Sequence, residues 1–275
     1  MSTATMNVVE RPSEVALPER NDVSFPRVVK SEWIKFATLR SSWFTLLGAV
    51  AAVVVIALVI GGNIGSKWST LAPDDVAPSG VLRGYFLGQL LIGVLGVLFV
   101  SAEYSTGMIR STLAAVPRRI PVVLAKALVF GGVALVAMVA ASATGFLGAQ
   151  GLLSQYGHGV SLGDPGVLRV VVGTGAYLAM IGLIGSALGW IVRSTAGGIA
   201  GLVGILIVVP VVLGVMPGTW GKNVVEYLPA GAGSAFTSSL HTTYMLSPGA
   251  GFAVLLAWVL GGLLAAAVLV KRRDA

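Results

Sequence analysis

Six long apolar stretches, separated by shorter polar or charged segments, dominate the chain from residue 43 onward. Each is close to the ~20 residues that an α-helix needs to cross the hydrocarbon core of a bilayer. The predicted transmembrane helices cover about residues 43–62, 85–102, 122–147, 170–192, 197–216 and 251–270. The pattern therefore predicts an all-α integral membrane protein. The third span is long enough to tilt or to extend past the bilayer, and Pro210 is expected to kink the fifth.

The segment before the first span, VVKSEWIKFATLRSSW at residues 28–43, alternates cationic and aromatic side chains. At helical spacing, Val29, Trp33, Phe36 and Arg40 share one side, while Lys30 and Lys35 lie on another. This pattern predicts an amphipathic helix over residues 27–41 that lies in the membrane interface. Its rings would sit at headgroup depth and its cations would face anionic lipid. The residues assigned to it are Lys30, Trp33, Lys35, Phe36 and Arg40. A generic aromatic belt with basic flanks is the alternative.

Residues 1–26 are polar and of mixed charge, and they contain three prolines. No apolar run follows directly from a short basic start, which argues against a cleaved signal peptide. These residues are predicted to form a flexible cytoplasmic tail, and residues 27–275 a single membrane domain.

Composition and charge support the membrane assignment and set the orientation. Of the 275 residues, 56% are hydrophobic and only 11% are charged, too few to cover the surface of a soluble protein of this size. Of the 18 Lys and Arg, 14 fall on the side of the two termini and 4 on the other side. Both termini are therefore predicted to be cytoplasmic, and the even number of spans agrees with this because it places both termini on one side. The net charge of +7 follows from this topology and does not indicate a nucleic-acid partner.

The chain offers little for catalysis or cofactor binding. It has no cysteine, and its two histidines, His158 and His241, lie far apart. The stretches GNIGSKWS (residues 62–69) and WGKN (residues 220–223) do not match a phosphate loop. The predicted spans hold almost no ionisable residue at mid-membrane depth, which disfavours ion-coupled carriers. No catalytic, cofactor or metal site is predicted.

The loop between the second and third spans, SAEYSTGMIRSTLAAVPRRIPVVLAKAL at residues 101–128, carries the most informative pattern. It predicts a short amphipathic helix at Met108–Ala115. Pro117 would end this helix, because the residue before a proline is disfavoured in helical geometry. Arg118 and Arg119 then follow its C-terminus, where cations are favoured. A simple basic loop with a turn would also explain the charges, but not this spacing.

Three stretches of the chain resemble permease subunits of ABC-type exporters of the type-2 class, and most of all those of GC-rich Gram-positive bacteria. The stretches are SEWIKFATLRSSWFTLL (residues 31–47), the spacing E-Y-x-x-G-x-x-R-x-x-L-x-x-x-P-x-R (residues 103–119) and LPAGAGSAF (residues 228–236). The resemblance implies an amphipathic connecting helix before the first span and a coupling helix in the first cytoplasmic loop. It also implies short re-entrant helices in the outer loop 217–248.

The same resemblance implies the partners and the location of the protein. It implies a separate ATPase subunit that holds ATP and magnesium, a second permease copy of the same or a different chain, and the bacterial plasma membrane. This chain would have no enzymatic activity of its own. The residues assigned to ATPase coupling are Glu103, Gly107, Arg110, Pro117, Arg118 and Arg119. Arg110 is expected to pair with an acidic residue of the ATPase or with Glu103.

Two other functions remain open from the sequence: a non-transporting membrane scaffold or immunity protein, and an ion-coupled carrier. The sequence does not identify the substrate or the residues that contact it.

Overall fold

The computed structural model describes residues 24–240 and 242–272, without the side chains of 73 and 74. Most of the predicted N-terminal tail lies outside these residues. The described chain is helical, and it contains no β-strand.

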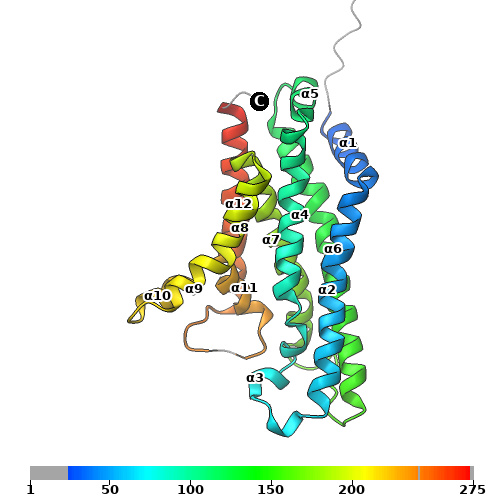
Figure 1. The fold of residues 1–275 in the computed structure, drawn as a ribbon, viewed down its shortest axis with the longest axis vertical. Helices are drawn as coiled ribbons and strands as arrows, with labels where there is room; N and C mark the ends of the chain where they lie inside the picture. The colour runs from blue at the N-terminus through cyan, green and yellow to red at the C-terminus, as the bar shows by residue number, and fades with distance from the viewer. Residues whose placement is uncertain (1–23, 241, 273–275) are drawn as a thin grey trace, which may run out of the picture.

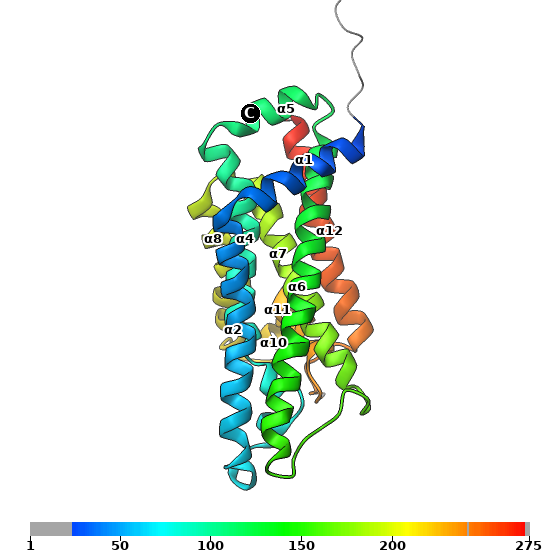
Figure 2. The same cartoon turned by 90° about the vertical axis from the view of Figure 1, so that its right-hand side faces the viewer.

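Six helical segments are long and apolar enough to cross a membrane, which confirms the prediction of an all-α, multi-pass membrane protein. They are α2 (Arg40–Gly65), α4 (Tyr85–Ser105), α6 (Ile120–Ser154), α7 (Val167–Val192), the composite Thr195–Gly214 and α12 (Pro248–Arg272). At 1.5 Å per residue, the 35 residues of α6 extend over about 52 Å, well beyond a hydrocarbon core of about 30 Å. Both α2 and α6 project past the other helices at the end opposite α5 (Figures 1 and 2).

The fifth span is divided into α8 (Thr195–Val203), a π-helical turn η3 (Gly204–Val208) and α9 (Val209–Gly214). Pro210 follows this turn directly. Because proline has no N–H to donate, regular α-helical hydrogen bonding is interrupted just where the π-helical turn forms. Figure 1 shows α8 and α9 running obliquely away from α12.

Glycines allow α4 and α7 to pack closely at the centre of the bundle. A Cβ at Gly96 would overlap the carbonyl oxygen of Gly182, and a Cβ at Gly185 would overlap that of Gly93. Gly189 likewise faces the backbone of Val97. The two helices thus meet backbone to backbone, as small residues permit in membrane helices.

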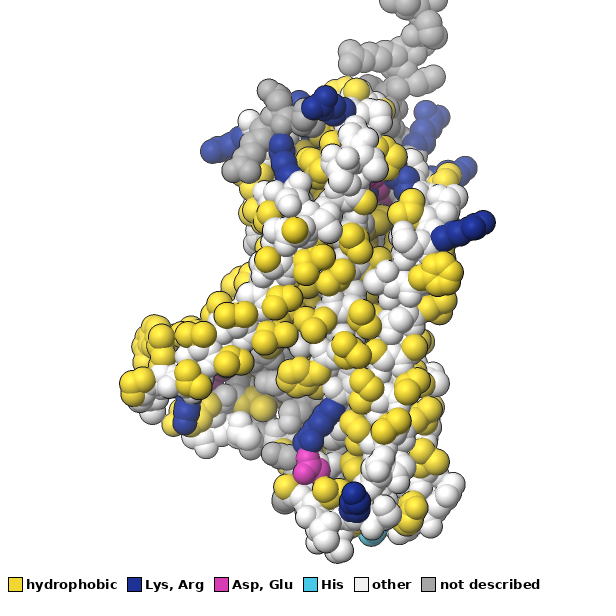
Figure 3. Space-filling model, in the orientation of Figure 1, with side chains coloured by type: hydrophobic (Ala, Val, Ile, Leu, Met, Phe, Trp, Pro, Cys, Tyr) yellow, Lys and Arg dark blue, Asp and Glu magenta, His cyan; other side chains and the backbone are white. Residues whose placement is uncertain are grey.

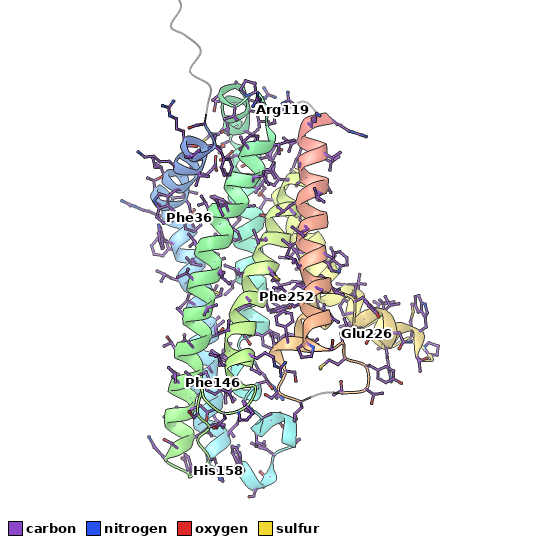
Figure 4. All side chains as sticks on the ribbon, turned by 180° about the vertical axis from the view of Figure 1, so that it is seen from behind. Phe36, Arg119, Phe146, His158, Glu226 and Phe252 are labelled. Carbon is purple, nitrogen blue, oxygen red and sulfur yellow. The ribbon has the colours of Figure 1, made fainter. Side chains whose placement is uncertain are left out.

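Two short helices occupy the segment between the fifth and sixth spans: α10 (Trp220–Val225) and α11 (Pro229–Thr237). The second is largely buried, and Phe236 meets Phe252 of α12 edge-on at 5.8 Å between ring centroids. Figure 4 shows Glu226 and Phe252 at this level, while His158 lies much nearer the far end of the molecule. Helix α11 therefore packs against α12, and the re-entrant interpretation of this segment stays a prediction.

The remaining short elements define the two ends of the molecule. Helices α1 (Phe25–Thr38) and α5 (Met108–Ala115) lie at the same end as the last turn of α12. Cationic side chains gather at this end, and hydrophobic side chains cover the middle of the molecule (Figure 3). The opposite end carries η1 (Trp68–Thr70), α3 (Pro73–Val76), η2 (Gly80–Leu82) and the loop at 155–166.

The orientation can be tested by single cysteine substitutions, because the natural chain has no cysteine. Ser111→Cys and Ser194→Cys are expected to react with a membrane-impermeant maleimide only after the cells are permeabilised. Ser69→Cys and Ser161→Cys are expected to react in intact cells. All four serines are exposed in the structure, so burial does not complicate the comparison. Labelling of Ser194→Cys from outside would contradict the proposed topology.

Candidate functional site

A buried cluster of four charged side chains joins three helices beneath α5. Glu32 and Lys35 come from α1, Glu103 from α4 and Lys126 from α6. Lys35 Nζ lies 2.7 Å from Glu32 Oε1 and 3.0 Å from Glu103 Oε1. Lys126 Nζ lies 2.7 Å from Glu32 Oε2 and 2.9 Å from Glu103 Oε1. The four groups form a closed ring of alternating charge with no net charge.

Neutral groups complete the cluster and connect it to α5. Lys35 Nζ donates a hydrogen bond to Thr112 Oγ1 of α5 at 3.1 Å. Lys126 Nζ donates to the carbonyl oxygen of Phe99 at 3.3 Å and lies 4.2 Å from the centroid of its ring. The cluster therefore links α1, α4, α5 and α6.

Burial makes the pairing within this ring necessary. The side chain of Lys126 is 1% exposed, and both carboxylates are almost fully buried. An unpaired charge in such surroundings costs several kcal/mol, so each member depends on its neighbours of opposite charge. Burial alone would lower the pKa of Lys35, which lies outside the membrane spans. The attraction of the Glu32 and Glu103 carboxylates outweighs this effect of burial and raises the pKa of Lys35, so Lys35 is protonated at neutral pH.

Helix α5 has the predicted bounds, Met108–Ala115, and its ends have a local cause. Gly107 has a φ of 73°, which glycine adopts without steric cost, and this turns the chain out of α4. Val116, the residue before Pro117, leaves helical geometry at the other end. Ile109 and Leu113 pack inward, and the opposite face of α5 is exposed.

The predicted coupling residues separate into two groups. Glu103 is buried in the ionic cluster. Gly107, Arg110, Pro117 and Arg118 are exposed around α5, and Arg119 donates a hydrogen bond to the carbonyl oxygen of Val270 in α12 at 3.1 Å. Figure 4 shows Arg119 near the end of α12. Of the two partners expected for Arg110, Glu103 is wrong, because Glu103 pairs with Lys35 and Lys126 and Arg110 is exposed; an acidic residue of the ATPase stays a prediction.

The predicted helix before the first span is present as α1, but its buried face differs from the prediction. The buried residues are Val28, Glu32 and Phe36, spaced four apart, and Trp33 is 46% exposed. Phe36 is fully buried and meets Phe99 edge-on at 5.5 Å, so its ring packs inside the protein and does not face lipid headgroups. Lys35 faces the cluster and not the lipid. The interfacial role predicted for these two residues is therefore wrong, whereas Lys30, Trp33 and Arg40 are exposed as expected.

Sequence reasoning missed Glu32 and Lys126 as members of the site. Lys126 is counted with the cations of the loop stretch 101–128, although the predicted span 122–147 also covers it; in the structure it belongs to α6 and is buried. Two signals were present: Lys126 lies within an apolar run, and Glu32 lies four residues from both Val28 and Phe36.

Comparison with known proteins finds no family model and no curated protein that matches this chain. The fold and the site themselves define a multi-pass α-helical membrane protein. At one end of it, buried ion pairs hold the amphipathic helix α1 to α4 and α6, and a hydrogen bond from Lys35 to Thr112 connects α1 to the short helix α5.

The structural role of the cluster can be tested by removing one charge. Lys126→Met leaves two buried carboxylates with one lysine, and it is expected to lower the free energy of unfolding by about 3–5 kcal/mol. Removing one charge of each sign, in Lys126→Met with Glu103→Gln, is expected to recover part of this loss. The measurement is thermal unfolding of the purified chain in detergent, with the exposed Lys30→Met as control. Equal unfolding of Lys126→Met and Lys30→Met would contradict a structural role for the cluster.

Proposed function

We propose that this chain is the transmembrane permease subunit of an ABC-type exporter of the type-2 class in a bacterial plasma membrane. The observation that carries the proposal is the position of α5. This short helix has the predicted bounds and exposes one face. Its other face is hydrogen-bonded to α1, and the ionic cluster connects α1 to the spans α4 and α6. A separate ATPase subunit would bind ATP and magnesium, since this chain offers no phosphate loop.

The arrangement supports a route from an ATPase to the spans. The exposed face of α5 carries Met108, Arg110 and Ser111, and Arg118 follows close by. An apolar side chain flanked by cations suits a groove with acidic edges on the partner. A push on α5 would reach α1 through Lys35 and Thr112, and it would reach α4 and α6 through Glu103 and Lys126. Because separating buried ion pairs is costly, the helices joined by the cluster would move together.

Uncovered apolar surface supports a second permease copy. The fifth span is the least buried of the six, so most of its apolar surface is free for another copy or for lipid. An apolar cavity of about 610 Å³ lies between α7, η3 and α12, and Ile184, Ile205 and Trp258 contribute to its walls. Walls of this kind suit a hydrophobic or amphipathic substrate, whose identity remains open.

The genomic neighbourhood separates this proposal from a membrane scaffold or immunity protein. A neighbouring reading frame with a phosphate loop would supply the ATPase, and its product would be the partner for the experiment below. If no ATPase co-purifies with the chain, the scaffold interpretation is favoured.

The docking surface can be tested by reversing its charges. Arg118→Ala alone is expected to weaken ATPase binding by less than about fivefold, because an exposed ion pair contributes about 1 kcal/mol or less. Arg110→Glu with Arg118→Glu adds repulsion and is expected to weaken binding by more than about tenfold. The measurements are co-purification of the tagged permease with its ATPase and ATP hydrolysis by the complex.

A matched control reverses two exposed cations away from α5, in Lys67→Glu at the opposite end with Lys222→Glu in α10, and is expected to leave binding unchanged. If the Arg110 and Arg118 variant binds and hydrolyses ATP like the natural protein, this surface is not the docking site. The connection at residues 193–196 would then be tested next.

A further inference from the structure

An apolar groove lies on the membrane-facing side of the junction between α1, α2 and α6. Its walls include Trp33 of α1, Trp43 and Leu46 of α2, and Val129, Gly132 and Val136 of α6. The groove has a volume of about 590 Å³, within the range of small-molecule sites. Figure 4 shows Phe36, which packs edge-on against Trp43 at 5.7 Å, near this junction.

The groove exists because one position on α6 has no side chain. No atom lies within 4 Å of the place where a Cβ on Gly132 would be. One wall is also held in place, because Trp43 Nε1 donates a hydrogen bond to the carbonyl oxygen of Ala37 at 3.0 Å. The tryptophan is thereby anchored to the end of α1.

Each tryptophan of the groove has a cationic residue three positions before it on the same helix. Lys30 precedes Trp33 by three residues in α1, and Arg40 precedes Trp43 by three residues in α2. Residues three apart are neighbours on a helix surface. Both cations are exposed, and neither has a carboxylate partner within the described part of the chain. Lys35, by contrast, is already held by Glu32 and Glu103.

We propose that this groove binds one anionic phospholipid of the cytoplasmic leaflet. An acyl chain would lie over Gly132 between α2 and α6, and the phosphate would lie near Lys30 and Arg40. The groove presents an apolar wall, then the tryptophans, then the cations. This order matches the acyl chain, the glycerol and the headgroup of a lipid. Tryptophan also prefers the interfacial depth of the glycerol region. The cations select an anionic lipid over a zwitterionic one. This inference does not depend on the proposed transport function.

The proposal can be tested by native mass spectrometry of the full chain in detergent, titrated with phosphatidylglycerol or phosphatidylcholine. The natural protein is expected to retain one phosphatidylglycerol more strongly than phosphatidylcholine. A cation near a membrane surface contributes about fivefold, so Lys30→Gln with Arg40→Gln is expected to reduce this preference by about 25-fold. Added inorganic phosphate is expected not to displace the lipid, because it has no chain to bury.

Gly132→Leu fills the groove and is expected to abolish strong retention of both lipids. The matched control is Gly48→Leu on α2, which is also exposed with no atom within 4 Å of an added Cβ. Gly48 is two residues from Leu46, about 200° around the helix and away from the groove. Thermal unfolding of both variants verifies that they fold.

Four results would overturn the proposal: equal retention of both lipids by the natural protein, undiminished binding by Gly132→Leu, an equal loss in Gly48→Leu, or displacement of the lipid by inorganic phosphate. A loss of dimer mass in Gly132→Leu, with lipid retention unchanged, would assign the groove to a second copy of the chain instead.

Discussion

The need to pair buried charges governs the end of the molecule that carries α1 and α5. Glu32, Glu103 and Lys126 are almost completely removed from solvent, and each would be strongly destabilising alone. Their pairing with one another and with Lys35 fixes the rotation of α1 about its axis, because only one rotation directs Glu32 toward Lys126. That rotation in turn places Phe36 in the core and leaves Trp33 and Lys30 outside. The shape of the surface that faces the lipid therefore follows from an interaction within the protein.

The close packing of α4 against α7 is a second constraint, which lies deeper in the bundle than the ionic cluster. The glycines of α4 and α7 bring two backbones into contact, which leaves no room for side-chain rearrangement between them. Helix α4 is thus held by close packing along its middle and by Glu103 at its end. Any force applied at α5 meets a helix that is stiffly joined to α7. This combination favours movement of helices as units over local bending.

The success of sequence reasoning varied with the physical origin of each feature. The six spans follow from bilayer thickness and hydropathy, which are local properties of the chain, and they were predicted to within a few residues at most ends. Helix α5 was predicted with its bounds because Gly107 and Pro117 act on the backbone next to them. The face of α1 was predicted wrongly, since a hydropathy pattern assigns Glu32 to solvent. Its burial depends on Lys126, which is 94 residues away in the sequence and was itself assigned to a loop. A charge within an apolar run or on the apolar face of a helix signals burial, but the local pattern does not identify the partner on a distant helix that makes the burial possible.

The two sides of α1 differ in their surroundings: one side packs against the protein, and the other side is exposed. Three cations follow Arg27 in this region and can be compared directly: Lys30 and Lys35 belong to α1, and Arg40 opens α2. Lys35 is neutralised within the cluster, so it adds little to the field at the lipid surface. Lys30 and Arg40 have no such partner within the described residues, and both are exposed. Since the cluster is neutral as a whole, it neither repels nor attracts an anionic headgroup nearby. A lipid at the junction would then stabilise the contact of α1 with α2 and α6 without competing for the ion pairs that hold α1 to α4.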